Sequence, residues 1–378
     1  MILLIAYDIT RISFIFAAGS TLSSICKTDN ISGKIINKLI IEILRTTGIY
    51  AAVFFLFSLT GCIPSLAPSW FLSYLLHISI LVLMSALLWK LRLWPAGDSK
   101  LFFVCGLLPP LLLPEILNFP LTLSFSLLLN ILLPAAAVFI AEAAADLCRQ
   151  ISQRNFSPES LLQNKNISDF VNSFFVFFLA RYIRVLLMSF FKLDNYLFFA
   201  LMIFIYPVIS KLLKNIWISL FLTLMLFILF FFTESMQELT YSAFISIGLS
   251  LPFIMLRKLM DILMQNDSVM PMHPKFLKEG VILTDRYKDI VKQAYPEFYS
   301  GVLYKIYPDG LSIFQANMLS KLIKEDNSRT PGLTPLEIRR GKPFAVWITA
   351  GLVLTLLTNG ENIAALCKKT ISLISGQI

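Results

Sequence analysis

Two aspartates in short polar segments are the residues best placed to do chemistry. Asp29 lies in the segment 27–38, after the first apolar run, and Asp98 lies in the segment 94–101, between the third and fourth. If the apolar runs are membrane spans, both carboxylates lie on the same side of the membrane. Two close carboxylates share one proton, so one can act as general base on water while the other polarises or protonates a peptide. The alternative is a pair of ordinary interfacial charges beside lysines.

The elements that must position these aspartates are membrane helices. Of the 378 residues, 57% are hydrophobic and 15% charged, whereas a soluble protein carries roughly 25% charged residues. A membrane span needs about 20 mainly apolar residues. The sequence therefore predicts an all-α integral membrane protein, a polytopic helical bundle of about ten spans. The predicted spans are 5–26, 47–63, 71–90, 101–118, 121–140, 169–190, 195–211, 216–233, 241–256 and 343–358.

The distribution of Lys and Arg predicts the orientation of the spans. Every second connection is basic, which is typical of loops on the cytoplasmic side. This pattern places both termini outside and both aspartates inside. The sixth span contains Arg181 and Arg184, so an amphipathic helix along the inner surface is an alternative there. The predicted domains are an N-terminal catalytic membrane bundle (1–141), additional membrane helices (142–256), a small cytoplasmic insert domain (257–342), and a last span with an outer tail (343–378).

Composition also argues against two other kinds of function. The net charge of +9 comes from basic residues in the loops, so it indicates membrane orientation and not nucleic-acid binding. The five cysteines are scattered, and the two histidines, His77 and His273, are far apart in sequence. Neither spacing is typical of a metal site. We expect no metal and no cofactor, and we expect the N-terminus to be a retained first span.

Three segments resemble motifs of the prepilin and preflagellin peptidases, a family of membrane aspartic proteases. The segment 96–101 is similar to their Gly-x-Gly-Asp-x-Lys signature, with Pro95 at the first glycine. The segment 28–38 resembles the first-aspartate segment, with Ile36 where proline is usual. The segment 343–348 is similar to the opening of the family's last span. The resemblance covers the first four spans and the last one.

This resemblance implies that Asp29 and Asp98 are catalytic. The motif-supporting residues that it implies are Gly97, Lys100, Gly33, Lys34, Asn37, Pro343 and Phe344. The implied activity is removal of the short leader of prepilin-like or preflagellin-like precursors. Such a precursor has a basic leader and an apolar helix, and it is cleaved at the cytoplasmic face of a prokaryotic plasma membrane. The family's four-cysteine loop for N-methylation is missing, so we expect peptidase activity alone.

Three alternatives stay open at this point. A polytopic transporter or channel is the first, with Arg181 and Arg184 marking a polar pathway. A catalytically inactive pilus or secretion assembly protein derived from a peptidase is the second. In the third, Tyr7-Asp8 takes the place of the Tyr-Asp element of presenilin-like proteases, although span counting puts Asp8 on the outer side.

Overall fold

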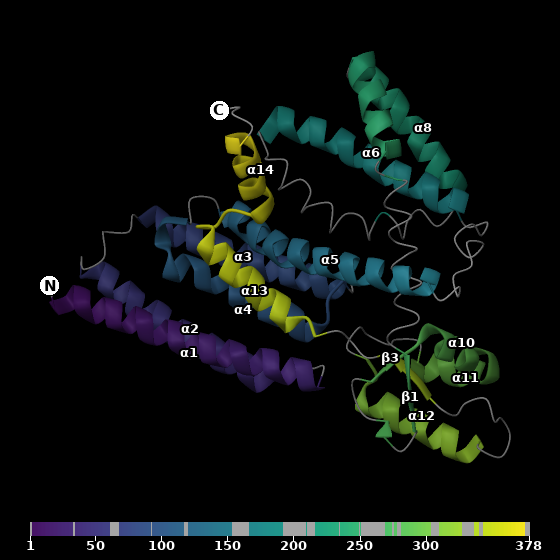
Figure 1. Cartoon of the computed structure of the whole chain (residues 1–378), viewed down its shortest axis with the longest axis horizontal. Coiled ribbons are helices and arrows are strands. Elements are labelled where there is room, and N and C mark those ends of the chain that lie inside the picture. The colour runs from purple at the N-terminus through teal and green to yellow at the C-terminus, as the bar shows by residue number, and fades with distance from the viewer. Residues whose placement is uncertain are drawn as a thin grey trace. The chain divides into compact units, whose positions relative to one another are not determined.

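The computed structural model describes residues 2–32, 35–60, 68–91, 93–116, 120–152, 166–191, 209, 216–233, 235–248, 250, 269–273, 276–277, 281–303, 310–326, 336–339 and 343–374. Helices dominate this part of the chain (Figure 1). The first helices are α1 (Ile2–Ser32), α2 (Asn37–Leu59), α3 (Pro68–Lys90), α4 (Ala96–Leu112), η1 (Pro114–Ile116) and α5 (Pro120–Ser152). They are followed by α6 (Asn166–Phe191) and α8 (Ile216–Thr233). The remaining elements are β1 (Val269–Met272), β2 (Ile282–Leu283), α10 (Asp285–Ala294), α11 (Pro296–Phe298), η4 (Tyr299–Leu303), α12 (Ile313–Asp326), β3 (Leu336–Arg339), α13 (Ala345–Leu357) and α14 (Ile363–Ile374).

Four of these helices are long and apolar enough to cross a membrane. The qualifying stretches are Ile5–Asn30, Asn37–Leu59, Ser69–Lys90 and Thr122–Glu142, in α1, α2, α3 and α5. Two shorter apolar stretches, Trp217–Phe232 and Ala345–Leu357, lie in α8 and α13. Apart from Ile209, the predicted span 195–211 lies outside the described residues.

The helix α2 begins ten residues before the predicted span 47–63. Lys38 and Arg45 are therefore part of its first turns and not of a loop. Long basic side chains can lay their methylene stems along an apolar helix while the charge stays in water. Only Ile40, Ile43, Thr47, Tyr50 and Phe54 of this helix are buried, at spacings of three and four residues, as expected for one buried stripe.

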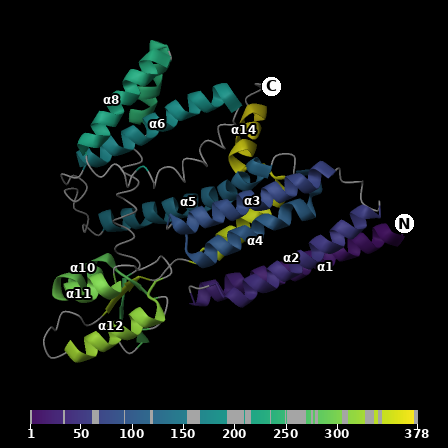
Figure 2. The ribbon, with the colours of Figure 1, turned by 180° about the vertical axis from the view of Figure 1, so that it is seen from behind.

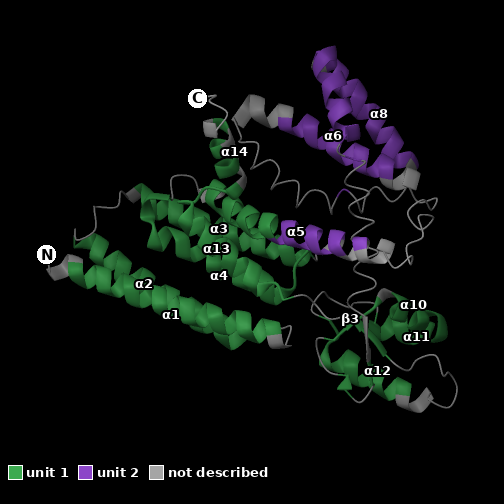
Figure 3. Ribbon diagram, viewed as in Figure 1, with its two compact units in different colours: residues 1–134, 267–378 green, residues 135–266 purple. Residues whose placement is uncertain are grey.

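Two compact units make up the chain, residues 1–134 with 267–378, and residues 135–266 (Figure 3). In the first unit α1 and α2 run side by side (Figures 1 and 2). The helix α4 packs against α2, α3 and α13, and α13 also contacts α1. Most of α4 is buried, so this helix is the centre of the membrane part of the unit.

A pair of prolines interrupts the backbone hydrogen bonds of α4. In an α-helix the carbonyl of Gly106 would accept the N–H of residue 110, but residues 109 and 110 are both proline and have no N–H. His77 of α3 supplies the missing donor, with Nε2 2.9 Å from the Gly106 oxygen. Ser124 of α5 lies 3.0 Å from His77 Nδ1. We assign Nε2 as the protonated nitrogen, because a carbonyl only accepts.

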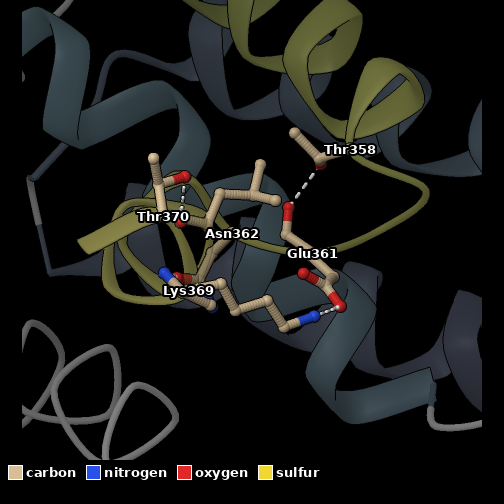
Figure 4. A network of polar contacts seen from close by, with 7 residues as sticks. Thr358, Glu361, Asn362, Lys369 and Thr370 are labelled. Carbon is tan, nitrogen blue, oxygen red and sulfur yellow. Dashed lines mark hydrogen bonds and ion pairs between the residues drawn. The ribbon is translucent and has the colours of Figure 1, made fainter. Parts of the chain in front are cut away.

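The connection from α13 to α14 is held by polar contacts (Figure 4). Thr358 donates to the carbonyl of Glu361, and Lys369 pairs with the Glu361 carboxylate. Asn130 of α5, fully buried, donates to the Glu361 carbonyl and accepts the N–H of Ile363 at 2.8 Å. A single buried amide therefore bonds to both sides of the connection between α13 and α14.

Residues 269–339 include a small antiparallel sheet with strand order β1-β3-β2. Val269 faces Arg339 across β1 and β3, and Ile282 faces the same residue across β2 and β3. A core built around Tyr287, Val291, Leu319 and Leu336 joins the sheet to α10 and α12. These described residues thus have a hydrophobic cluster of their own within the first unit, and their sheet was not part of the all-α prediction.

In the second unit α6 packs against α8 through a cluster of phenylalanines, which includes Phe175, Phe178 and Phe230. Arg181 of α6 reaches the described helix 236–248. Its Nε lies 3.3 Å from Ser242 Oγ, and its terminal nitrogen lies 3.7 Å from Glu238. This arginine therefore has both a hydroxyl and a carboxylate partner inside the unit.

Candidate active site

Asp29 lies near the end of α1, and its side chain is buried, with 5% of its surface exposed. Its Oδ2 accepts the backbone N–H of Ala345, at a distance of 3.0 Å. The first N–H groups of a helix have no partner within the helix. The residue that precedes α13, Phe344, has no side chain that can cap it. Asp29 therefore caps α13 from another helix, where the positive end of the helix dipole favours a carboxylate.

Asp98 lies in the first turn of α4, and its side chain is 8% exposed. The helix begins directly after Pro95, which has extended backbone geometry at the N-cap. Proline removes a backbone donor and disfavours a helical conformation in the residue before it. The Trp-Pro pair at 94–95 thus determines where α4 starts, and with it the position of Asp98.

Three contacts bring the segments around these aspartates together. The rings of Trp94 and Phe344 meet edge to face, 5.1 Å between centroids. Lys100 Nζ donates to Asn37 Oδ1 at 3.0 Å. A Cβ on Gly97 would lie 3.2 Å from Cβ of Ile35, closer than most real Cβ contacts. Gly97 is thus suited to the close approach of α4 to the segment before α2.

These contacts form a closed path through both aspartates. Asp29 is bonded to the start of α13, the residue before that helix packs on Trp94, and Trp94 lies one turn before Asp98. The segment that follows α1 returns to α4 through Asn37 and Lys100. The three motif segments thus meet at one end of the helices of the first unit. Both carboxylates lie at that end.

The other predicted site residues have different outcomes. Asn37, Gly97, Lys100 and Phe344 make the contacts given above. Pro343 is described as the residue before Phe344, half-buried and outside the helix. Gly33 and Lys34 lie outside the described residues.

The alternative aspartate, Asp8, lies near the opposite end of α1. A helix rises about 1.5 Å per residue, so Asp8 and Asp29 are roughly 32 Å apart along the axis. The Asp8 side chain is exposed. Its neighbour Tyr7 is buried and packs on Phe54 and Phe57 of α2. This geometry separates Asp8 from the motif segments and gives Tyr7 a packing role.

Sequence reasoning missed two residues of this arrangement, Trp94 and Ile35. Trp94 is buried and contacts both Phe102 and Phe344. The sequence contains one signal for Trp94, which is its place directly before Pro95 and the start of a helix. A large ring at such a place can pack on the start of a second helix. Nothing in the spacing of Ile35 indicated its contact with Gly97.

The arrangement has the components of acid–base chemistry. Two carboxylates shielded from water lie at one end of a helical bundle: Asp29 caps the start of α13, and Asp98 lies in the first turn of α4. Among the described residues no group of three or more His, Cys, Asp or Glu side chains is arranged to hold a metal ion. The comparisons of the chain with family models, curated proteins and solved structures found no match.

Proposed function

We propose that the chain is a membrane aspartic endopeptidase that removes the leader of prepilin-like or preflagellin-like precursors, with Asp29 and Asp98 as its dyad. One observation carries the proposal. The three segments that resemble the family's motifs meet at one end of the first unit, through the Asp29–Ala345, Trp94–Phe344 and Lys100–Asn37 contacts. The first and last of these segments are more than 300 residues apart in sequence, and two buried carboxylates lie at the end where they meet.

The proposed reaction is hydrolysis of one peptide bond. The ionised carboxylate takes a proton from water, and the hydroxide adds to the scissile carbonyl carbon. The protonated carboxyl polarises the carbonyl and then supplies the proton that the leaving amine needs as the C–N bond breaks. No cofactor takes part in this scheme.

The proposed organisation in the membrane follows the basic-loop pattern. About ten spans cross a prokaryotic plasma membrane, with both termini outside. The insert domain at 257–342 and the dyad face the cytoplasm. A precursor would present its basic leader in the cytoplasm and its apolar helix in the bilayer. Such a polypeptide is the proposed partner, and no nucleic acid is involved.

The decisive experiment tests cleavage of a co-expressed prepilin-like precursor, measured as the decrease in the mass of the precursor. We expect Asp29→Asn and Asp98→Asn each to abolish cleavage, because asparagine cannot take or give the proton. Asp8→Asn is the matched control on α1, and it should cleave at the parent rate. If both asparagine variants of the dyad process the precursor normally, the peptidase proposal is wrong.

A purely structural role of Asp29 predicts a different result. The Asn side chain still has an oxygen that accepts the Ala345 N–H, so Asp29→Asn keeps the cap while Asp29→Ala removes it. We expect Asp29→Ala to lower the stability by about 0.5–2 kcal/mol and Asp29→Asn to leave it nearly unchanged. Loss of cleavage in a stable Asp29→Asn variant separates catalysis from capping. If that variant still cleaves the precursor, Asp29 only caps α13 and is not catalytic.

A further inference from the structure

A groove between α3 and α4 lies beside the candidate active site. Its α3 wall consists of Val82, Ser85, Ala86 and Trp89. These positions follow the i, i+3, i+4, i+7 spacing of one helix face. Val82 is 51% exposed and Trp89 47% exposed, so this face is not covered by the rest of the described chain.

The α4 wall has the same spacing, with Ala96, Ser99, Lys100 and Phe103. Two matching helix faces therefore enclose the groove, whose volume is about 420 Å³. Pockets of this size hold small molecules in many proteins. Of these four side chains, Ala96 and Phe103 are apolar and Ser99 has a hydroxyl. Lys100 carries a positive charge.

Polarity changes along the groove in the way it changes across half a bilayer. Trp89 and Ala96 lie at the polar end, beside the last turn of α3 with its Lys90. Val82 and Phe103 lie seven residues further along each helix, roughly 10 Å deeper at 1.5 Å per residue. Tryptophan is enriched at the headgroup level of membrane proteins. The apolar end of the groove is thus at acyl-chain depth.

Lys100 has capacity for an anion at the polar end. Its Nζ uses one of three donors on the neutral amide oxygen of Asn37. Among the described residues no carboxylate is within ion-pair distance of it. Its long side chain can carry the charge to the headgroup level.

Two hydroxyls in the groove lack partners. Ser85 Oγ and Ser99 Oγ are buried and make no hydrogen bond within the described part of the chain. Helical serines elsewhere in this protein donate to the carbonyl four residues back, as Ser79, Ser246 and Ser250 do. A buried hydroxyl without a partner costs free energy, and a ligand in the groove can bond to these two only after their side chains rotate toward it.

We propose that this groove binds one anionic phospholipid. An acyl chain lies along Val82, Ala86 and Phe103, and the phosphate is bound by Lys100. The positive charge at the rim selects an anionic over a zwitterionic headgroup. This site does not depend on the proposed peptidase activity.

The test is native mass spectrometry of the full chain in detergent, titrated with phosphatidylglycerol or with phosphatidylcholine. We expect the parent to bind phosphatidylglycerol more tightly. Lys100→Gln should weaken that binding by about tenfold, as for loss of one charge-assisted hydrogen bond, and should remove the headgroup preference. Ala86→Trp fills the groove and should abolish binding of both lipids.

Leu83→Trp is the matched control, because Leu83 is 60% exposed on α3 and does not line the groove. It should bind both lipids as the parent does. Equal binding of the two lipids by the parent, or unchanged binding in Lys100→Gln and Ala86→Trp, would overturn the proposal. A photo-reactive benzophenone at position 86 gives a second measurement in native membranes. Crosslinking to phospholipid is expected, and crosslinking only to another protein would assign the groove to a partner helix instead.

Discussion

At the scale of single residues, His77 shows how a local defect in one helix is repaired by another. The carbonyl of Gly106 would bond to residue 110 in an α-helix or to residue 109 in a 3₁₀-helix, and both are proline. His77 of α3 donates to this carbonyl, with Nε2 2.9 Å from the Gly106 oxygen. Ser124 of α5 is hydrogen-bonded to the other ring nitrogen. The buried imidazole is therefore a donor required by the two prolines, and it ties three helices together.

This role predicts a double-mutant result. His77→Phe keeps a ring of similar volume but leaves the Gly106 carbonyl without that donor, so it should destabilise the protein by about 1–3 kcal/mol. Adding Pro110→Ala restores a backbone N–H four residues after Gly106, and it should recover much of the loss. Thermal unfolding of the four proteins of the cycle, purified in detergent, measures the coupling. Strictly additive effects of the two substitutions would contradict the interpretation.

At this scale, span counting and the motif resemblance selected the candidate residues, and their catalytic role stays a prediction. Asp29 follows the first predicted span and Asp98 lies between the third and fourth, so span counting places both on one side of the membrane. The motif resemblance alone singled out Asn37, Lys100 and Phe344. The Asp29–Ala345 bond was not predictable, because it depends on how α1 and α13, more than 300 residues apart, pack together. A charge pattern gives the side of the membrane, but it gives no pairing between helices.

At the scale of elements, α5 and α13 approach each other unusually closely. A Cβ on Gly351 would lie 2.9 Å from both N and Cα of Ile131. These are backbone atoms, so the contact cannot be relieved by a side-chain rotation. The absence of a side chain at Gly351 therefore determines the spacing of the two helices.

Gly351→Ala should accordingly destabilise the protein by about 1–3 kcal/mol, as for overpacking. Gly48→Ala is the matched control in α2, where a Cβ would meet no atom within 4 Å. Because alanine favours helix, that control should be neutral or stabilising by up to about 1 kcal/mol. Thermal unfolding in detergent compares the two. Equal stability of both variants would show that α5 and α13 separate at no cost.

Several elements were not predictable from hydropathy. The start of α2 was not predictable because Lys38 and Arg45 are typical of a loop, whereas long basic side chains are also tolerated in the first turns of a membrane helix. The sheet of the insert domain was missed because strands of two to four residues, such as Ile282–Leu283, carry almost no periodic signal. The helix α14 lies in the predicted outer tail, and its 12 residues are too few for a span to be predicted there.

At the scale of the whole molecule, the number of crossings depends on α13. This helix has 13 residues and is therefore about 20 Å long, whereas the hydrocarbon core of a bilayer is roughly 30 Å thick. Asp29 caps its start, and Asn130 bonds to the connection just after its end. A short span of this kind is tolerated if the bilayer thins locally or flanking residues adapt.

Labelling on both sides of α13 tests this crossing and with it the proposed topology. In a background where Cys26, Cys62, Cys105 and Cys148 are replaced by serine, the exposed Cys367 of α14 reports one side. Met318→Cys, at a partly exposed position of α12, reports the other side when Cys367 is also replaced. We expect a membrane-impermeant thiol reagent to label Cys367 in intact spheroplasts and to label position 318 only after permeabilisation, because α13 separates the two. Labelling of both after permeabilisation is the control for accessibility. If both positions react from the same side, α13 does not cross the membrane, and the count of ten spans with both termini outside is wrong.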